Sequence, residues 1–100
     1  MAFGIKRKEL VAWKIKVAAG ELAFLTHYWT DPRFPKSHAV TKAGCSDIKK
    51  LIAWGEIYGL KKEWIHQDKH YPHFDLMGDV QIKVLTAHNL TDQIERFRLQ

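Results

Sequence analysis

One stretch, Gly44 to Leu60, constrains the fold most, because it contains both ends of a helix and the apolar face between them. Ser46 is a good N-cap, and Asp47 suits the first turn, where the partial positive charge favours a carboxylate. Gly59 ends the helix, since glycine adopts the left-handed conformation without a Cβ penalty. The residues that follow one another at helical spacing are Ile48, Leu51, Ile52, Gly55 and Tyr58. The pattern predicts a helix over 46–58.

Gly55 is unusual in this helix, because an interior glycine costs about 1 kcal/mol relative to alanine. We therefore expect another element to pack close to the backbone at this position. Directly after Gly59, Leu60 is expected to fold back on Trp54 and close the helix end.

Alternating residues predict strands on both sides of this helix, over Ser37–Ala43 and Lys61–His66. A strand, a helix and a strand in this order have the form of a βαβ unit. We therefore expect the two strands to be parallel, with a right-handed crossover. Glu21–Trp29 is a further strand with apolar residues on both faces, which is typical of a strand covered on both sides.

Three more helices are expected. Lys6–Ala19 has a broad apolar face and a lysine-rich remainder. Asp79 and Asn89 are natural caps, so we favour a helix between them, although residues 80–84 also alternate like a strand. A last short helix begins at Thr91 or the residue after it.

Together these segments predict a single domain of the α/β class over residues 1–100. The expected order is α-β-β-α-β-α-α, with a small mixed sheet flanked by helices. A chain of 100 residues can bury one modest core. Its apolar content of 46% and charged content of 27% are ordinary for globular proteins and argue against disorder.

The net charge of +5 is unevenly distributed. Residues 1–45 hold eight Lys and Arg against three Asp and Glu, whereas residues 46–100 hold eight of each. A basic excess favours anionic partners, and nucleic acid is one of them, although no recognised nucleic-acid-binding motif is present. Because lysine-rich helix faces are common, we favour a solvated surface for the first helix and rank nucleic acid below a small anionic molecule.

Cys45 is the single cysteine, so the chain cannot form an internal disulfide, which fits a reducing compartment. A thiol near a helix N-terminus can act as a nucleophile, but we favour a small buried hydrophobe, since no protease signature surrounds it.

The longest apolar-rich stretch without Lys, Arg, Asp or Glu runs from Leu22 to Thr30. It is too short for a membrane span, and no signal peptide is evident. We expect a soluble cytoplasmic protein.

Three of the six histidines lie between Trp64 and Gly78. His73 and Asp75 are two residues apart and point the same way in an extended chain. Asp75 can therefore orient His73 as an acid, a base or a ligand, and its charge is expected to raise the pKa of the imidazole. We expect Trp64 to wall the site or stack on a base, and His38 to join it from a neighbouring strand. The spacings of zinc sites are absent, so no metal is predicted, and a purely structural role for the stretch stays open.

Four other residues are candidates for ligand contacts. His27 and Asp31 lie near Arg33, whose guanidinium fork can bind a phosphate or a carboxylate. A simple loop-stabilising pair of Asp31 and Arg33 is the alternative. Lys83 lies one turn into its helix and could bind an anion together with the helix N-terminus.

Six segments carry a family resemblance: Gly4–Arg7, Ala23–Trp29, Arg33–Pro35, Val40–Cys45, Tyr58–Ile65 and Pro72–Leu76. Through them the chain resembles the YneQ-like small cytosolic proteins of Gram-positive bacteria over nearly its whole length. The second half also resembles a wider phage and bacterial domain of unknown function with a His-aromatic-Asp motif. That domain usually has a Lys/Arg pair near Lys83, whereas a single lysine stands here, which weakens the anion site. The resemblance implies the fold and a site at His73 and Asp75, but no reaction.

Two functions fit this sequence. The leading hypothesis is a pocket for an anionic ligand, such as a nucleotide or phosphoester, lined by His38, His73, Asp75, Trp64 and Arg33. The alternative is a non-enzymatic adaptor or nucleic-acid-associated protein that uses the basic N-terminal half. A pocket requires residues 27–38 to lie beside 64–75, whereas an adaptor requires an exposed apolar or basic patch. The sequence identifies no cofactor and no oligomeric state.

Overall fold

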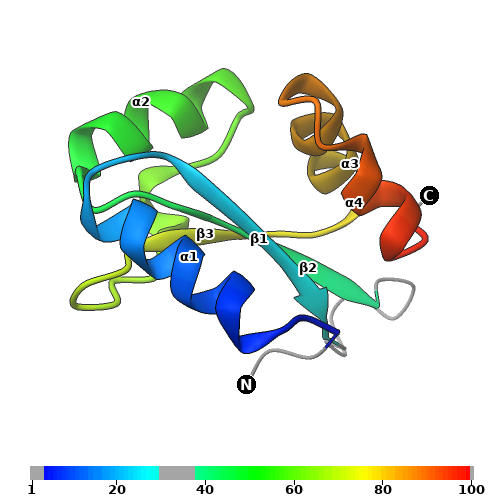
Figure 1. The fold of residues 1–100 in the computed structure, drawn as a ribbon. Helices are drawn as coiled ribbons and strands as arrows, with labels where there is room; N and C mark the ends of the chain where they lie inside the picture. Colours follow the sequence, from blue (N-terminus) through cyan, green and yellow to red (C-terminus); the bar gives the residue numbers. More distant parts are fainter. Residues whose placement is uncertain (1–3, 30–37, 100) are drawn as a thin grey trace.

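Helices cover both faces of a three-stranded sheet in the computed structural model, which describes residues 4–29 and 38–99 (Figure 1). A single turn of 3-10 helix, η1 (Lys62–Trp64), lies between the second long helix and the third strand. The elements in chain order are α1 (Arg7–Ala18), β1 (Ala23–Tyr28), β2 (Ala39–Gly44), α2 (Ile48–Ile57), β3 (His73–Leu76), α3 (Gly78–Ala87) and α4 (Thr91–Arg96). The predicted order α-β-β-α-β-α-α is confirmed.

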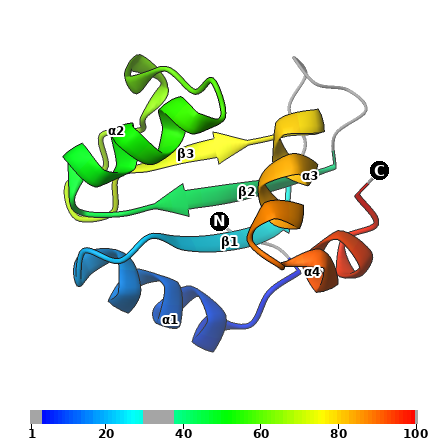
Figure 2. The same cartoon turned by 90° about the horizontal axis from the view of Figure 1, so that it is seen from above.

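The sheet has the order β1-β2-β3, and both of its strand pairs are antiparallel. Tyr28 lies opposite Ala39 at one end of β2, and His73 lies opposite Gly44 at the other. The expected parallel βαβ unit, and with it the mixed sheet, is therefore wrong. The chain that follows α2 runs back along the molecule, so β3 starts beside the end of β2 rather than beside its beginning (Figure 2).

The expected strand over Lys61–His66 is also wrong. Lys61, Lys62, Glu63 and Trp64 are all exposed, and Ile65 alone is buried, so this segment has no face to place in a sheet interior. It forms η1 and then a single bridge from His66 to His73. The strand that completes the sheet is the next alternating segment, in which Phe74 and Leu76 are fully buried.

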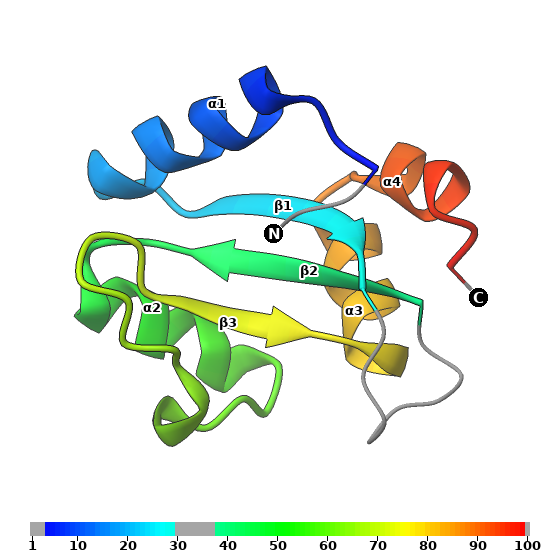
Figure 3. The same ribbon diagram turned by 90° about the horizontal axis from the view of Figure 1, so that it is seen from below.

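The two faces of the sheet are covered differently. On one face, Phe74 and Leu76 pack with side chains of α2 and α3, among them Leu51, Trp54 and Val84. On the other face, Trp13 and Val17 of α1 pack on Ala23 and Leu25 of β1. Figure 3 shows α1 lying along β1, with α2 on the far side of the sheet. On this face, α1 covers the part of the sheet that β1 forms, so the part that β3 forms is left partly open.

The ends of α2 follow from its sequence. Asp47, rather than Ser46, is the N-cap, and its carboxylate accepts a hydrogen bond from the backbone N–H of Lys50 at 3.2 Å. Gly59 has a φ of +73°, and the N–H of Leu60 donates to the carbonyl of Gly55 at 2.9 Å, which closes the helix as a Schellman motif.

Cys45 is buried between β2 and α2, and its thiol donates to the carbonyl of Gly20 at 3.4 Å. This placement fits the interpretation as a small buried hydrophobe. In the part of the chain that the structure describes, no helix is both long enough and apolar enough to cross a membrane.

The close approach predicted at Gly55 is confirmed. A Cβ at this position would lie 2.7 Å from two ring atoms of Phe74, a side chain that is 1% exposed. Contacts this short require the ring or the helix to shift. The absence of a side chain at Gly55 therefore sets the distance between α2 and the sheet.

We expect Gly55→Ala to destabilise the protein by about 1–3 kcal/mol, because overpacking outweighs the better helix propensity of alanine. Chemical denaturation of both proteins measures the difference. Ala53 is exposed on the same helix and serves as a control, since Ala53→Gly should cost about 1 kcal/mol through propensity alone. A Gly55→Ala protein that is more stable than the parent would contradict the packing argument.

Candidate functional site

His66, His73 and Asp75 form a cluster at the outer edge of β3. His73 and Asp75 share one face of the strand because successive side chains alternate. His66 joins them through a backbone bridge, in which its N–H donates to the carbonyl of His73 at 2.8 Å and the N–H of His73 donates back at 3.3 Å. The fold thus brings together residues that are seven positions apart in the chain.

The side chains of the cluster lie close to one another. Nε2 of His66 is 2.8 Å from Oδ2 of Asp75, and Nε2 of His73 is 3.5 Å from Oδ1 of the same carboxylate. The two imidazoles are stacked, with ring centroids 5.1 Å apart and an angle of 5° between the planes. The His66 side chain is 60% exposed, that of Asp75 27% and that of His73 10%, so the cluster opens to solvent on the His66 side.

The protonation of His73 follows from its second ring nitrogen. Nδ1 lies 2.8 Å from the carbonyl oxygen of Tyr71, which can only accept, so Nδ1 carries the hydrogen. In the neutral ring, Nε2 is then a bare lone pair that faces Oδ1 of Asp75. Oδ1 is buried and accepts no hydrogen bond from any described residue. Two acceptor atoms at this distance repel each other unless a proton or a cation lies between them.

Burial lowers the pKa of His73 below its ordinary value, because the charged ring loses hydration. The carbonyl of Tyr71 and the charge of Asp75 act in the opposite direction but do not reverse it, and Lys42, opposite Asp75 on β2, lowers the pKa further. The expected rise from the Asp75 carboxylate is present, but the net direction is the reverse of the prediction. Near neutral pH, His73 is therefore a neutral imidazole with a free lone pair on Nε2.

The structure does not bring His38 to this cluster. It precedes β2 at the end opposite Gly44, and its Nε2 is hydrogen-bonded to the carbonyl oxygen of Phe97. Its ring stacks on Tyr28, with centroids 6.2 Å apart. In an antiparallel sheet these contacts place it one strand length away from His73.

The other predicted ligand residues are dispersed. Trp64 is 53% exposed in η1 and lies under the ammonium of Lys61, 5.7 Å from the ring centroid, without a described ring contact to the cluster. Lys83 is exposed on α3. Asp31 and Arg33 lie outside the described residues, so the structure does not place them.

His27 is on the same face of the sheet as Asp75 but is buried. Its Nδ1 lies 3.1 Å from the carbonyl of Tyr28, and its Nε2 is buried without a hydrogen-bond partner among the described residues. Burial lowers the pKa of His27, and Lys42 acts in the same direction. These features make it a second neutral histidine beneath the surface.

His66 is the member of the cluster that was not among the predicted site residues. Its position depends on hairpin pairing across residues 66–73, which no side-chain spacing reveals. The one available signal was the density of histidines in this stretch.

A comparison with curated proteins supports the family resemblance. The chain is 61% identical over 99 residues to a relative described as "Uncharacterized protein YneQ" from Bacillus subtilis (strain 168). The alignment covers 99% of this chain and 100% of the relative. No protein-family model matches the chain, and no solved structure matches it.

We expect His73 to titrate below its ordinary pKa of about 6.5, and Asp75→Asn to lower this pKa further, because the carboxylate's attraction for the charged ring is lost. Long-range ¹H–¹⁵N NMR correlations measure both values. A His73 that titrates above the ordinary value would show that the carboxylate, not burial, dominates.

The same shift predicts how stability depends on pH. Since the pKa of His73 is lower in the folded than in the unfolded chain, the free energy of unfolding should be highest above about pH 6.5 and fall as the pH drops through the folded-state pKa. His27 contributes with the same sign. Denaturation between pH 7.5 and 5, a range that spans the ordinary value, should give a smaller slope for His73→Gln than for the exposed control His70→Gln.

Proposed function

This chain belongs to the YneQ family, and we propose that it is a metal-binding protein in which His66, His73 and Asp75 hold a divalent transition-metal ion that keeps open positions for an anionic ligand. The observation that carries the proposal is the pair of facing acceptors, Nε2 of His73 and the unpartnered Oδ1 of Asp75, 3.5 Å apart. A cation between them would use both lone pairs. One ligand atom from each of the three residues lies within 4.8 Å of the others.

The spacing of these atoms suits a tetrahedral ion. Metal–ligand bonds of about 2.0–2.2 Å at tetrahedral angles separate neighbouring ligand atoms by about 3.3 Å. Nε2 of His73 lies 3.5 Å from Oδ1 of Asp75, close to this value, and Nε2 of His66 approaches the other carboxylate oxygen, Oδ2, at 2.8 Å. To bind the ion, His66 would take the tautomer in which Nε2 carries a lone pair instead of a hydrogen.

The surroundings of His73 also favour metal binding. Histidine ligands usually donate their second N–H to a carbonyl or a carboxylate, which fixes the ring and its tautomer, and the Tyr71 carbonyl supplies this contact. Imidazole and carboxylate ligands together suit zinc, iron, nickel or copper. Three protein ligands leave at least one coordination position free, as in zinc sites that bind substrates.

An ion at this place would supply the positive charge that an anionic ligand requires, beside an aspartate that would otherwise repel it. Lys42, opposite Asp75, adds a second positive group, and Trp64 lies on the exposed turn two residues before His66. A nucleotide or phosphoester is thus the proposed ligand class. The cytoplasm is the proposed compartment, because the one cysteine has no partner for a disulfide.

We expect Co²⁺, used as a spectroscopic probe, to bind the chelator-treated protein and give the d–d absorption of a tetrahedral site. His66→Ala is the sharpest variant, because this side chain is 60% exposed and its removal leaves the hydrophobic core intact, and it should weaken binding at least about tenfold. Asp75→Asn should do the same. His70→Ala, four positions away and exposed, is the matched control.

Thermal unfolding provides a second readout. At 100 times its dissociation constant, Zn²⁺ should stabilise the folded chain by about 2.7 kcal/mol, and the effect should vanish in His66→Ala or after chelation. Equal losses in His66→Ala and His70→Ala would contradict the site. If Co²⁺ binds but inorganic phosphate and AMP leave its spectrum unchanged, the ion site stands and the anionic ligand is withdrawn.

A further inference from the structure

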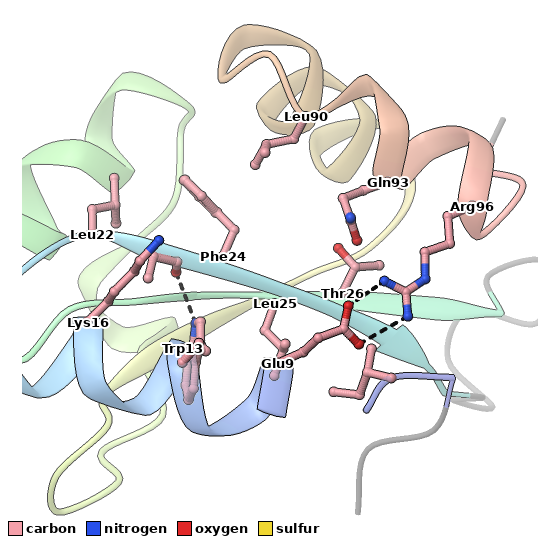
Figure 4. A pocket seen from close by; sticks show the side chains of 13 residues that line it. Glu9, Trp13, Lys16, Leu22, Phe24, Leu25, Thr26, Leu90, Gln93 and Arg96 are labelled. Atoms are coloured by element: carbon pink, nitrogen blue, oxygen red, sulfur yellow. Dashed lines mark hydrogen bonds and ion pairs between the residues drawn. The ribbon is translucent and has the colours of Figure 1, made fainter. Parts of the chain in front are cut away.

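We infer that the free edge of β1 is a docking site for an extended, carboxylate-bearing peptide segment of another protein, which adds to the sheet as a fourth strand. The edge forms the floor of a cleft of about 280 Å³ between α1 and the chain that connects α3 to α4 (Figure 4). This inference does not depend on the metal site, which lies at the opposite edge of the sheet.

The register shows which backbone groups face the cleft. The N–H of Trp29 donates to the carbonyl of its partner His38, so Trp29 and every second residue before it bond to β2. The N–H and carbonyl groups of Phe24 and Thr26 therefore point away from β2, into the cleft. They are a ready template for another strand.

The two edges of the sheet are not equivalent. The edge of β3 is partly occupied by the chain's own His66, which makes two backbone hydrogen bonds to His73. Along the edge of β1, Phe24 and Thr26 have no backbone hydrogen-bond partner on the cleft side among the described residues, and Thr26 is 3% exposed, so an added strand would enter between α1 and α4. The sequence from Ala23 to Tyr28 contains no lysine, proline or acidic residue of the kind that blocks strand addition.

The walls of the cleft fit a single strand. Ala12 and Trp13 of α1 line one side of the cleft. Leu90 and Gln93 line the other, across β1 from Trp13 (Figure 4). Alternate side chains of an added strand would therefore meet opposite sides of the cleft. The floor from Leu22 to Thr26 spans about 17 Å, the length of five extended residues. A second copy of this chain would bring its own flanking helices to a recess already walled by two elements, so a lone peptide segment is the better match.

Charge selects the kind of peptide. At one end of the cleft, Arg96 donates to Glu9 at 2.6 Å and 3.1 Å and to the carbonyl of Gly4 at 2.7 Å. Arg96 lowers the pKa of Glu9 to about 2, so this pair stays ionised and neutralises itself. Lys16 lines the other part of the cleft, and no ion pair with another described residue neutralises its ammonium, which can therefore meet a carboxylate of the peptide.

The test is a selection of phage-displayed heptapeptides on the full chain, followed by titration of synthetic copies. We expect enrichment of peptides that alternate apolar residues and carry Asp or Glu. Two N-methylated versions of the peptide separate the binding modes, one methylated at the odd-numbered amides and one at the even-numbered amides. Only one of them should lose binding, because only every second amide of an added strand faces β1. Ala12→Trp should fill the cleft and weaken binding at least about tenfold, whereas Ala18→Trp, exposed on the same helix outside the cleft, should not.

Charge reversal gives an independent arm. Lys16→Glu should weaken binding about threefold to tenfold, and Lys49→Glu, which changes the net charge equally on α2, should have no effect. The inference is overturned if no peptide is enriched, if Ala12→Trp leaves binding unchanged, or if basic peptides are selected. It is also overturned if sedimentation shows a dimer that Ala12→Trp dissociates, since the occupant would then be a second copy.

Discussion

The contact between the Trp13 indole and Gly44 holds α1 on the sheet, and both candidate sites depend on it. A Cβ at Gly44 would lie 2.6 Å from Cζ2 of Trp13, so the ring rests on bare backbone. The indole N–H donates to the carbonyl of Ala23 at 3.1 Å, which fixes the ring along the strand. The same ring lines the cleft beside β1 and meets the imidazole of His73 edge-on, with centroids 6.0 Å apart. One side chain thus sets the width of a groove and the position of a buried histidine.

The helices and the first two strands could be predicted because their signals are local. Gly59 and the apolar spacing of α2 mark its end and its buried face, and Gly55 revealed a close neighbour before that neighbour, Phe74, was known. The third strand could not be assigned securely, since it has only four residues, two of them polar. The competing segment at residues 61–66 contains Trp64 and Ile65, but tertiary packing buries only Ile65.

The candidate site was predictable only where it depends on one strand. His73 and Asp75 share a face because they are two residues apart, whatever the sheet around them. His66 and His38 depend on strand pairing instead: an antiparallel bridge brings the first to the cluster, and an antiparallel β2 carries the second to the far end. The direction of the His73 pKa likewise depends on burial, which no local pattern of charges reveals.

The unequal edges of the sheet also limit how molecules of this protein can associate. An open-ended β-polymer needs two free edges in every subunit, so that each added molecule exposes a new template. Here the chain occupies part of one edge itself, at the bridge between His66 and His73. This bridge shortens the template that β3 offers, so it favours a stoichiometry of one added strand per chain over growth into a fibre.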